Sequence, residues 1–268
     1  MKSPSFLIIC LCLFSFSCEK VIELDLEDSD RQIVIEAQLQ AGNNQFTVLV
    51  SQSSNYFSNE APVLISDAKV VLYDNSNSSI NLPLLKAGEY GGEINAEAGM
   101  TYSLEVELDG QVYQANTTVP TPVLLNTLDT TFLEATAFFD EGYQVVSRFE
   151  DDPLTENYYR VLHAIDEVWQ KDGTDLQVTN DRFFNGSENA RLPVFNHIFS
   201  SGEIITVTLQ HLDKVSFEYF NSLANIVGDG QGPNGGTAAP GNPPSNWSGD
   251  ALGYFGAVAG DTRSILLP

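Results

Sequence analysis

Cysteine is scarce in this 268-residue chain and is confined to its first 18 positions. The three cysteines are Cys10, Cys12 and Cys18, so the sequence beyond them has no thiol at all. A chain without cysteine forms no disulfide, no thiolate nucleophile and no cysteine-ligated metal site. The body of the protein must therefore be held together by packing, for which its length and 43% hydrophobic content are sufficient.

Basic residues are also few. The chain has 12 lysines and arginines against 36 aspartates and glutamates, which gives a formal net charge of −24. Such a charge repels phosphate backbones, so nucleic acid is excluded as an expected partner. Anionic lipid headgroups are repelled in the same way, so charge does not attract the body of the protein to a membrane.

Long hydrophobic runs are absent. The N-terminal run FLIICLCLF falls well short of the roughly 20 residues that a spanning helix needs. With Lys2 before it, this run predicts a signal peptide over residues 1–17. Ser17 and Cys18 then resemble the lipobox of bacterial lipoproteins, although Ser15 stands where leucine is commoner. The resemblance implies cleavage before Cys18 and its acylation with palmitate-like chains, which makes Cys18 a lipid anchor. An ordinary signal peptide with an incidental cysteine is the alternative.

Acidic residues gather directly after Cys18. They are Glu19, Glu23, Asp25, Glu27, Asp28 and Asp30. In Bacteroidota lipoproteins, acid at this place resembles the signal that sends a protein to the outer face of the outer membrane, although residues 20–22 interrupt it here. The resemblance implies exposure at the cell surface. The alternative is a solvated acidic face, since VIELDLE (21–27) alternates as a half-buried strand does.

Strand-like runs predict a mainly β protein whose first domain, residues 18–120, is an Ig-like sandwich. The runs are 31–39, 45–53, 67–74, 101–108 and 111–119. Asp109–Gly110 between the last two is a strong signal for a two-residue hairpin. The spacing of glycine and tyrosine resembles that of carboxypeptidase-regulatory and transthyretin-like sandwich modules, on Gly88, Tyr90, Gly99 and Tyr102.

A proline-containing linker over residues 121–126 is expected to lead into a second β-rich domain, 127–268. Its predicted strands are 127–140, 143–151, 157–170 and 203–212, followed by two closing strands after Trp247. The segment 157–170 also has helical spacing, but a strand is favoured because KDGTD follows it as a turn.

One segment of the second domain predicts a helix, near residues 214–227. Phe217, Phe220 and Ala224 fall on one stripe, and Asp213 or Ser216 can cap the helix. A glycine- and proline-rich loop over residues 228–246 follows. A loop of this length is uncommon in a compact domain, so it is expected to be mobile or to contact a partner.

The order of several segments resembles a family of uncharacterised Bacteroidota lipoproteins, the domain-of-unknown-function family 4249. The segments are SCEKVIELDL, DAKVVLYD, GEYGGEINAEAGMTYSLEVEL, NYYRVLHAID, DRFFNG, FEYFNSL and ALGYFGAV. Members are often encoded beside TonB-dependent outer-membrane transporters, so the resemblance implies an accessory role. The family has no agreed catalytic residues, and none is carried over to this chain.

Histidine patterns give little indication of chemistry. His163, His197 and His211 are the only histidines, and no two of them have the spacing of a metal-binding helix. We therefore expect no metal ligands and no catalytic residues. DGTD (172–175) offers oxygen atoms to Ca²⁺ but lacks a complete calcium loop, and a turn is the simpler interpretation. A weak calcium site is thus the one cofactor that the sequence allows.

Paired aromatic residues provide candidate contacts with a partner, because outward aromatic side chains anchor interfaces. Trp247, Tyr254 and Phe255 are selected, with burial in the core as the alternative. Together these features predict a binding protein without enzymatic activity, anchored at the outer membrane and partnering a TonB-dependent transporter in nutrient uptake. The alternatives are a carboxylate-based glycan hydrolase, since acidic pairs are plentiful, and a structural or adhesive surface lipoprotein.

Overall fold

The computed structural model describes residues 31–268, apart from 55–60, 77, 137–139, 196 and 228–240. The predicted signal peptide, Cys18 and the strand at 21–27 lie outside the described residues. Arg31–Pro268 form a single compact unit. The prediction of a mainly β protein with one short helix is confirmed for the described part of the chain.

The strands and helices keep to the alternating and helical patterns of the sequence. The strands of the N-terminal half are β1 (Ile33–Gln40), β2 (Gln45–Gln52), β3 (Val63–Leu64), β4 (Lys69–Tyr73), β5 (Ser79–Leu82), β6 (Leu84–Lys86), β7 (Glu89–Glu93), β8 (Thr101–Leu108) and β9 (Gln111–Thr118). The C-terminal half contains β10 (Leu125–Leu133), β11 (Gly142–Phe149), β12 (Tyr158–Ile165), β13 (Val168–Trp169), the 3₁₀ turn η1 (Gly173–Asp175), β14 (Gln177–Asn180), β15 (Ala190–Pro193), β16 (Ile204–Leu212), α2 (Lys214–Val227) and β17 (Leu252–Leu266).

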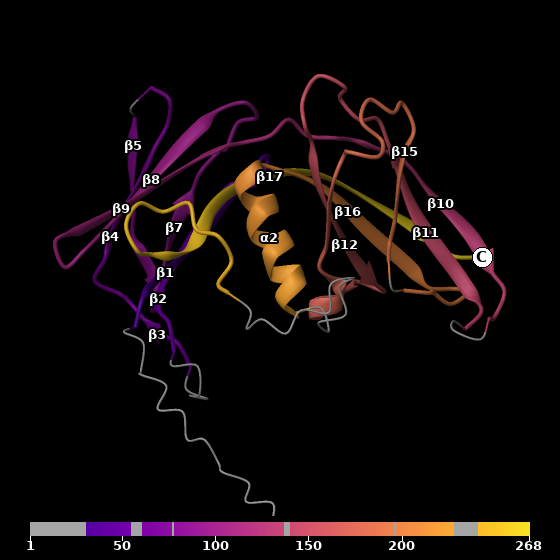
Figure 1. Cartoon of the computed structure of the whole chain (residues 1–268), viewed down its shortest axis with the longest axis horizontal. Helices are drawn as coiled ribbons and strands as arrows, with labels where there is room; N and C mark the ends of the chain where they lie inside the picture. Colours follow the sequence, from indigo (N-terminus) through magenta and orange to yellow (C-terminus); the bar gives the residue numbers. More distant parts are fainter. Residues whose placement is uncertain (1–30, 55–60, 77, 137–139, 196, 228–240) are drawn as a thin grey trace, which may run out of the picture. The chain divides into compact units, whose positions relative to one another are not determined.

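Three sheets organise the unit (Figure 1). The largest has the strand order β13-β12-β16-β17-β1-β2-β7-β6, with β14 added to β12 and β3 added to β2. A sheet of order β5-β4-β8-β9 packs against its β1–β2–β7 end, and a sheet of order β10-β11-β15 packs against its β12–β16 end. Each packed pair of sheets encloses its own hydrophobic core, so the unit contains two β-sandwiches.

The first sandwich follows the sequence prediction closely. Alternate residues of β8 point inward, among them Leu104 and Val106, which are fully buried. The turn between β8 and β9 consists of Asp109 and Gly110, with φ of 50° and 78°. Positive φ at both central positions is what a type I′ hairpin turn requires. The predicted hairpin is therefore confirmed.

The closing segment differs from the prediction of two strands, because β17 is a single strand of 15 residues. Its first part pairs in parallel with β1, and its second part pairs antiparallel with β16. Gly260 and Asp261 suggest a turn in the sequence, yet they remain in the strand. At Gly260 the backbone of β16 comes so close that a Cβ atom would lie 3.0 Å from the Leu209 carbonyl oxygen.

Strand β17 also changes the expected division into domains. Phe255 and Ala257 of β17, together with Trp247 and Ala251 just before it, belong to the core of the first sandwich. The N-terminal sandwich is therefore completed by the C-terminal end of the chain. The predicted linker 121–126 is shorter than expected, because Leu125 begins β10 and is fully buried.

In the second half, the segment 157–170 forms a strand, but the strand is shorter than predicted. Strand β12 ends at Ile165, and Asp166 and Glu167 make a tight turn with φ of 47° and 69°. Helix α2 has the predicted bounds. Asp213 caps it, because its Oδ1 accepts a hydrogen bond of 2.9 Å from the Ser216 amide.

The two faces of β12 and β16 have different partners. Val161 and Leu209 point into the core of the second sandwich, whereas Leu212 faces α2. The α2 side carries a small separate cluster, in which Tyr158 stacks on Phe217 with ring centroids 4.6 Å apart. The helix therefore covers the face of β12 and β16 that points away from the core of the second sandwich.

Candidate functional site

A cleft of about 820 Å³ lies between α2 and the sheet, which is within the size range of small-molecule sites. We call it the α2 cleft. Its floor consists of Arg160 on β12, Thr208 and Gln210 on β16, and Thr262 on β17, and its helical wall includes Phe220 and Leu223. Arg160 lies directly opposite Gln210 in the strand register, so the two polar side chains share one face.

Arg160 is the charged residue on the floor of the α2 cleft. Its guanidinium lies 4.2 Å from the centroid of the Phe220 ring, in a cation–π contact. Its Nε atom is buried and has no hydrogen-bond partner, and no carboxylate of the described residues forms a salt bridge with this arginine. Burial lowers the pKa of Arg160, and the nearby Tyr254 opposes this effect. The side chain remains charged near neutral pH, as arginine does in proteins.

Gln210 adds an acceptor beside this donor. Its side chain is 6% exposed, and its Oε1 has no hydrogen-bond partner in the described part of the chain. Buried polar atoms are nearly always hydrogen-bonded, so two unpartnered atoms on one cleft floor are unusual. A ligand with an anionic group and a hydrogen-bond donor would satisfy both.

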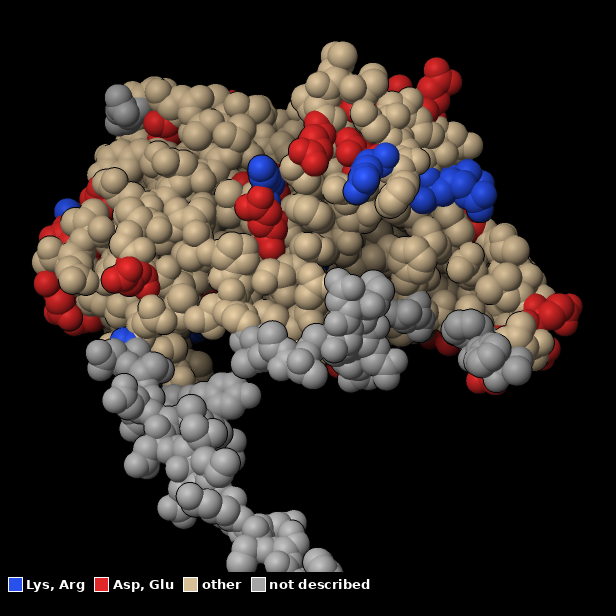
Figure 2. Space-filling model, viewed as in Figure 1, with Lys and Arg blue, Asp and Glu red and all other residues tan. Residues whose placement is uncertain are grey.

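Charge elsewhere on the surface is less concentrated. On the face shown in Figure 2, acidic side chains are scattered among uncharged ones, and the basic side chains gather mainly toward the upper right of the view. Lys171 and Asp172 stand at the exposed rim of the α2 cleft. The cleft is therefore distinguished by its half-buried arginine and not by its rim.

The aromatic residues selected from the sequence are in the interior. Trp247 is 6% exposed, and its Nε1 donates a 2.9 Å hydrogen bond to the Ile35 carbonyl. Phe255 is fully buried, and Tyr254 stacks on Tyr219 with ring centroids 4.2 Å apart. The prediction that these residues contact a partner is wrong for this structure, because neighbouring side chains already cover them. The predicted anchor Cys18 and residues 228–240 of the predicted loop lie outside the described residues.

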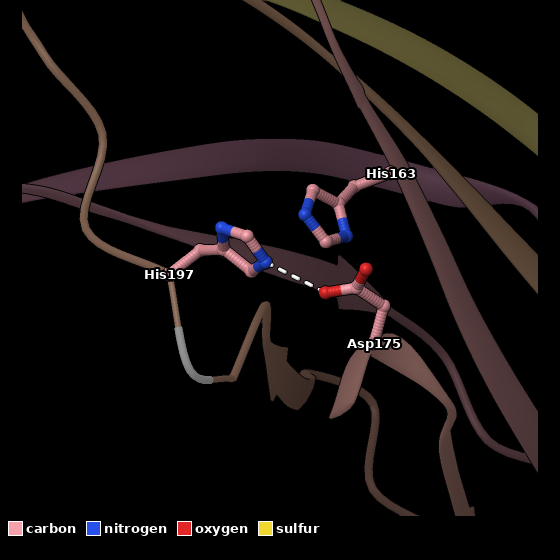
Figure 3. Close-up of side chains that lie close together, drawn as sticks. All are labelled: His163, Asp175 and His197. Carbon is pink, nitrogen blue, oxygen red and sulfur yellow. Dashed lines mark hydrogen bonds and ion pairs between the residues drawn. The ribbon is translucent and has the colours of Figure 1, made fainter. Parts of the chain in front are cut away.

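A second cluster joins His163, Asp175 and His197 (Figure 3). His163 lies on β12, Asp175 ends η1, and His197 follows β15. One ring nitrogen of each histidine and one oxygen of Asp175 all lie within 4.8 Å of one another. His197 Nε2 and Asp175 Oδ1 are 2.7 Å apart. The sequence prediction missed this cluster, because its members come from three separate segments and follow no local spacing.

The surroundings of the cluster set its protonation. Burial lowers the pKa of His163, and the neighbouring His197 lowers it further, so His163 is neutral near pH 7. Burial alone would raise the pKa of Asp175, but hydrogen bonds from His197 and from the Asp172 amide outweigh it, and the net pKa is lowered. Asp175 is therefore a carboxylate, with a 2.8 Å hydrogen bond from the Asp172 amide to its Oδ2.

The DGTD turn takes part in this cluster. Residues 173–175 form η1, and Asp175 turns toward the two histidines instead of facing a loop of oxygen ligands. The prediction of a weak calcium site stays a prediction.

The sequence matches the family described as "Domain of unknown function (DUF4249)" over residues 19–264. The chain belongs to this family.

Other comparisons add little to the family assignment. No curated protein sequence matches this family member. Among solved structures, similarity is found to a two-domain fibronectin type III segment of chicken tenascin, with 12% identity and a TM-score of 0.23 over 68% of this chain and 91% of that one. A DUF4785 family protein from Legionella pneumophila also has 12% identity and a TM-score of 0.23, over 66% of this chain and 52% of that one.

Within the described residues, no helix combines the length and apolarity needed to cross a membrane.

Proposed function

We propose that this protein is a lipid-anchored outer-membrane lipoprotein of Bacteroidota that binds a small amphipathic anion and assists a TonB-dependent transporter in taking it up. The observation that carries the proposal is Arg160 on the floor of the α2 cleft, which forms no salt bridge with a described residue. Apolar groups of Phe220 and Leu223 would contact the body of the ligand. The guanidinium would bind its carboxylate, sulfate or phosphate group.

The energetic reason is the cost of a partly buried cation. Removing a charged group from water costs several kcal/mol unless hydrogen bonds and an opposite charge compensate. At Arg160 the compensation among the described residues is the Phe220 ring, which contributes only about 0.5–2 kcal/mol. A fold that keeps an arginine in this position loses stability. A bound anion would compensate the charge of Arg160, and this binding would explain why an arginine occupies the position.

The sequence supports the proposed location at the outer membrane. Ser17–Cys18 matches the pattern at which lipoproteins are cleaved and acylated, and several acyl chains hold a protein on a bilayer effectively permanently. The acidic residues after Cys18 favour the outer face of the outer membrane.

Binding without chemistry is the better proposal for this cleft. Asp172 and Asp175 are the carboxylates that border it. A glycosidase needs a carboxyl group whose pKa is raised, so that it can donate a proton. The pKa of Asp175 is lowered instead, and both of its oxygens already accept hydrogen bonds. Arg160 would then serve to hold the ligand and not to activate it.

Affinity purification from native outer membranes tests the proposal. The tagged wild-type chain should co-purify with a TonB-dependent transporter, identified by mass spectrometry after mild crosslinking. Cys18→Ala is the control: it should leave the membrane fraction and lose the transporter. If no transporter is enriched with the wild-type chain over this control, an adhesive or structural role replaces the proposal. Retention of Cys18→Ala in the membrane would refute the anchor.

A further inference from the structure

We propose that His163, Asp175 and His197 form a binding site for a divalent transition metal, with Zn²⁺ as the best fit. The three side chains approach one another from β12, η1 and the segment after β15 (Figure 3). The inference stands on this geometry alone and does not depend on the ligand of the α2 cleft. It differs from the expectation from the sequence that the histidines hold no metal.

A buried donor atom without a partner points to a ligand at this place. His163 is 3% exposed, and its Nε2 atom has no hydrogen-bond partner among the described residues. A buried polar atom of this kind destabilises the fold if it stays unsatisfied. The ring packs edge-on against His197, with centroids 4.4 Å apart. Coordination of a metal ion by the imidazole of His163 would give this ring a polar partner.

The distances need only small adjustments. Around a tetrahedral zinc ion with bonds of about 2.0–2.2 Å, neighbouring ligand atoms lie about 3.3 Å apart. His197 Nε2 and Asp175 Oδ1, now 2.7 Å apart, would separate slightly as the ion replaces their hydrogen bond. The other ligand atoms lie within 4.8 Å and would move inward by side-chain rotation. Three protein ligands leave a fourth position open, as in many catalytic zinc sites.

The donor set selects the class of metal. Two imidazoles and one carboxylate suit Zn²⁺ and similar first-row ions, whereas Ca²⁺ and Mg²⁺ prefer oxygen ligands alone. Asp175 supplies one negative charge, so the site would carry a net charge of about +1 with the ion bound. The net charge of −24 on the chain also attracts cations to its surface.

The cluster is held from behind by structured residues. Phe199 is 1% exposed, and the His197 ring stacks on it with an interplanar angle of 14°. The Phe199 backbone pairs with Tyr143 through two hydrogen bonds of 2.8 and 2.9 Å. Gly142 permits this approach, because a Cβ atom there would lie 2.7 Å from the Phe199 carbonyl oxygen. Support of this kind orients metal ligands before the ion arrives.

An entry path is present. A second cavity of about 590 Å³ is lined by His163 and Asp175, and also by Phe183 and Phe184. Phe183 is 91% exposed, so the cavity is open to solvent at this residue. An ion could reach the cluster through this cavity, and the open fourth position would face water or a small ligand.

Isothermal titration with Zn²⁺ tests the proposal on the mature protein. Cleavage before Cys18 removes Cys10 and Cys12, and any thiol that remains free is first alkylated with N-ethylmaleimide, so that it cannot compete for the ion. The wild-type chain should bind one zinc ion, and Asp175→Asn and His197→Ala should each weaken binding by more than about tenfold. His211→Gln is the matched control. It removes the one histidine outside the cluster and should bind zinc as the wild-type chain does.

A second measurement covers variants that fold poorly. Circular dichroism confirms the fold of each variant, and His197 tolerates change best because its side chain is 26% exposed. Co²⁺ bound to the wild-type chain should show the visible absorption of a four-coordinate site, and His197→Ala should lose it. Absence of zinc binding by the wild-type chain, or equal binding by folded Asp175→Asn and His197→Ala, would overturn the proposal.

Discussion

Replacing Arg160 with methionine should make the ligand-free protein more stable. Methionine reproduces the unbranched stem of the arginine as far as Nε, so it can keep the packing of that stem while removing the guanidinium and its charge. The arginine is held against the Phe220 ring, with a buried Nε that lacks a hydrogen-bond partner within the described residues. If the charge is retained for a ligand, its removal relieves a cost that the free protein otherwise carries.

The expected gain follows from two opposing contributions. Burial of the cation costs several kcal/mol, and the cation–π contact with Phe220 offsets about 0.5–2 kcal/mol of this. Partial solvent access to the guanidinium reduces the cost further. We therefore expect Arg160→Met to raise the free energy of unfolding by about 1–3 kcal/mol, which corresponds to a rise in Tm of about 2–4 °C for each kcal/mol.

Urea denaturation followed by circular dichroism measures this change. Arg263→Met is the matched control, because Arg263 is an exposed arginine on β17, and its replacement should change stability by less than about 0.5 kcal/mol. A loss of more than about 1 kcal/mol in Arg160→Met, with the control unchanged, would refute the reasoning. Arg160 would then stabilise the fold, and no ligand would be needed to explain it.

Two further predictions concern the fold itself. Phe255→Ala should destabilise the protein by about 3–5 kcal/mol and speed hydrogen exchange in β2, because its buried ring contacts Phe46 of β2 at a centroid distance of 6.2 Å. Phe183→Ala, at an exposed site, should do neither, and a loss below about 1 kcal/mol for Phe255→Ala would contradict a shared core. Burial lowers the pKa of His211 more than its hydrogen bond to the Thr121 carbonyl raises it, so the unfolded state binds more protons between the folded and unfolded pKa values. Stability is then greatest above the unfolded pKa and falls as pH drops from about 7.5 to 5.5; His211→Gln should reduce that fall in urea titrations, and an unchanged pH dependence would count against it.

Local features of the fold could be predicted from the sequence because their causes are local. The β8–β9 hairpin depends on Asp109 and Gly110, whose backbone φ angles are positive. Helix α2 depends on its cap at Asp213 and on an apolar stripe. Each of these signals lies within a few residues of the element that it specifies.

Long-range features could not be predicted, because a sequence does not show which segments meet. The sequence predicts two closing strands, whereas β17 is a single strand in which Gly260 permits the close approach of β16 and does not form a turn. For Trp247 the sequence leaves a surface contact and burial in the core open, and the structure shows burial, with a hydrogen bond from its indole to the Ile35 carbonyl of β1. His163 and His197 become neighbours only when β12 and the segment after β15 come together.

Native mass spectrometry of the protein purified from its own membranes tests the central claim most directly. The account predicts that the wild-type chain carries a small anionic molecule, which is released on denaturation and is missing from Arg160→Met. The matched variant Arg263→Met should retain it. If the wild-type and Arg160→Met chains show the same bound species, or if neither carries any, then Arg160 does not hold a ligand and the proposed binding function is contradicted.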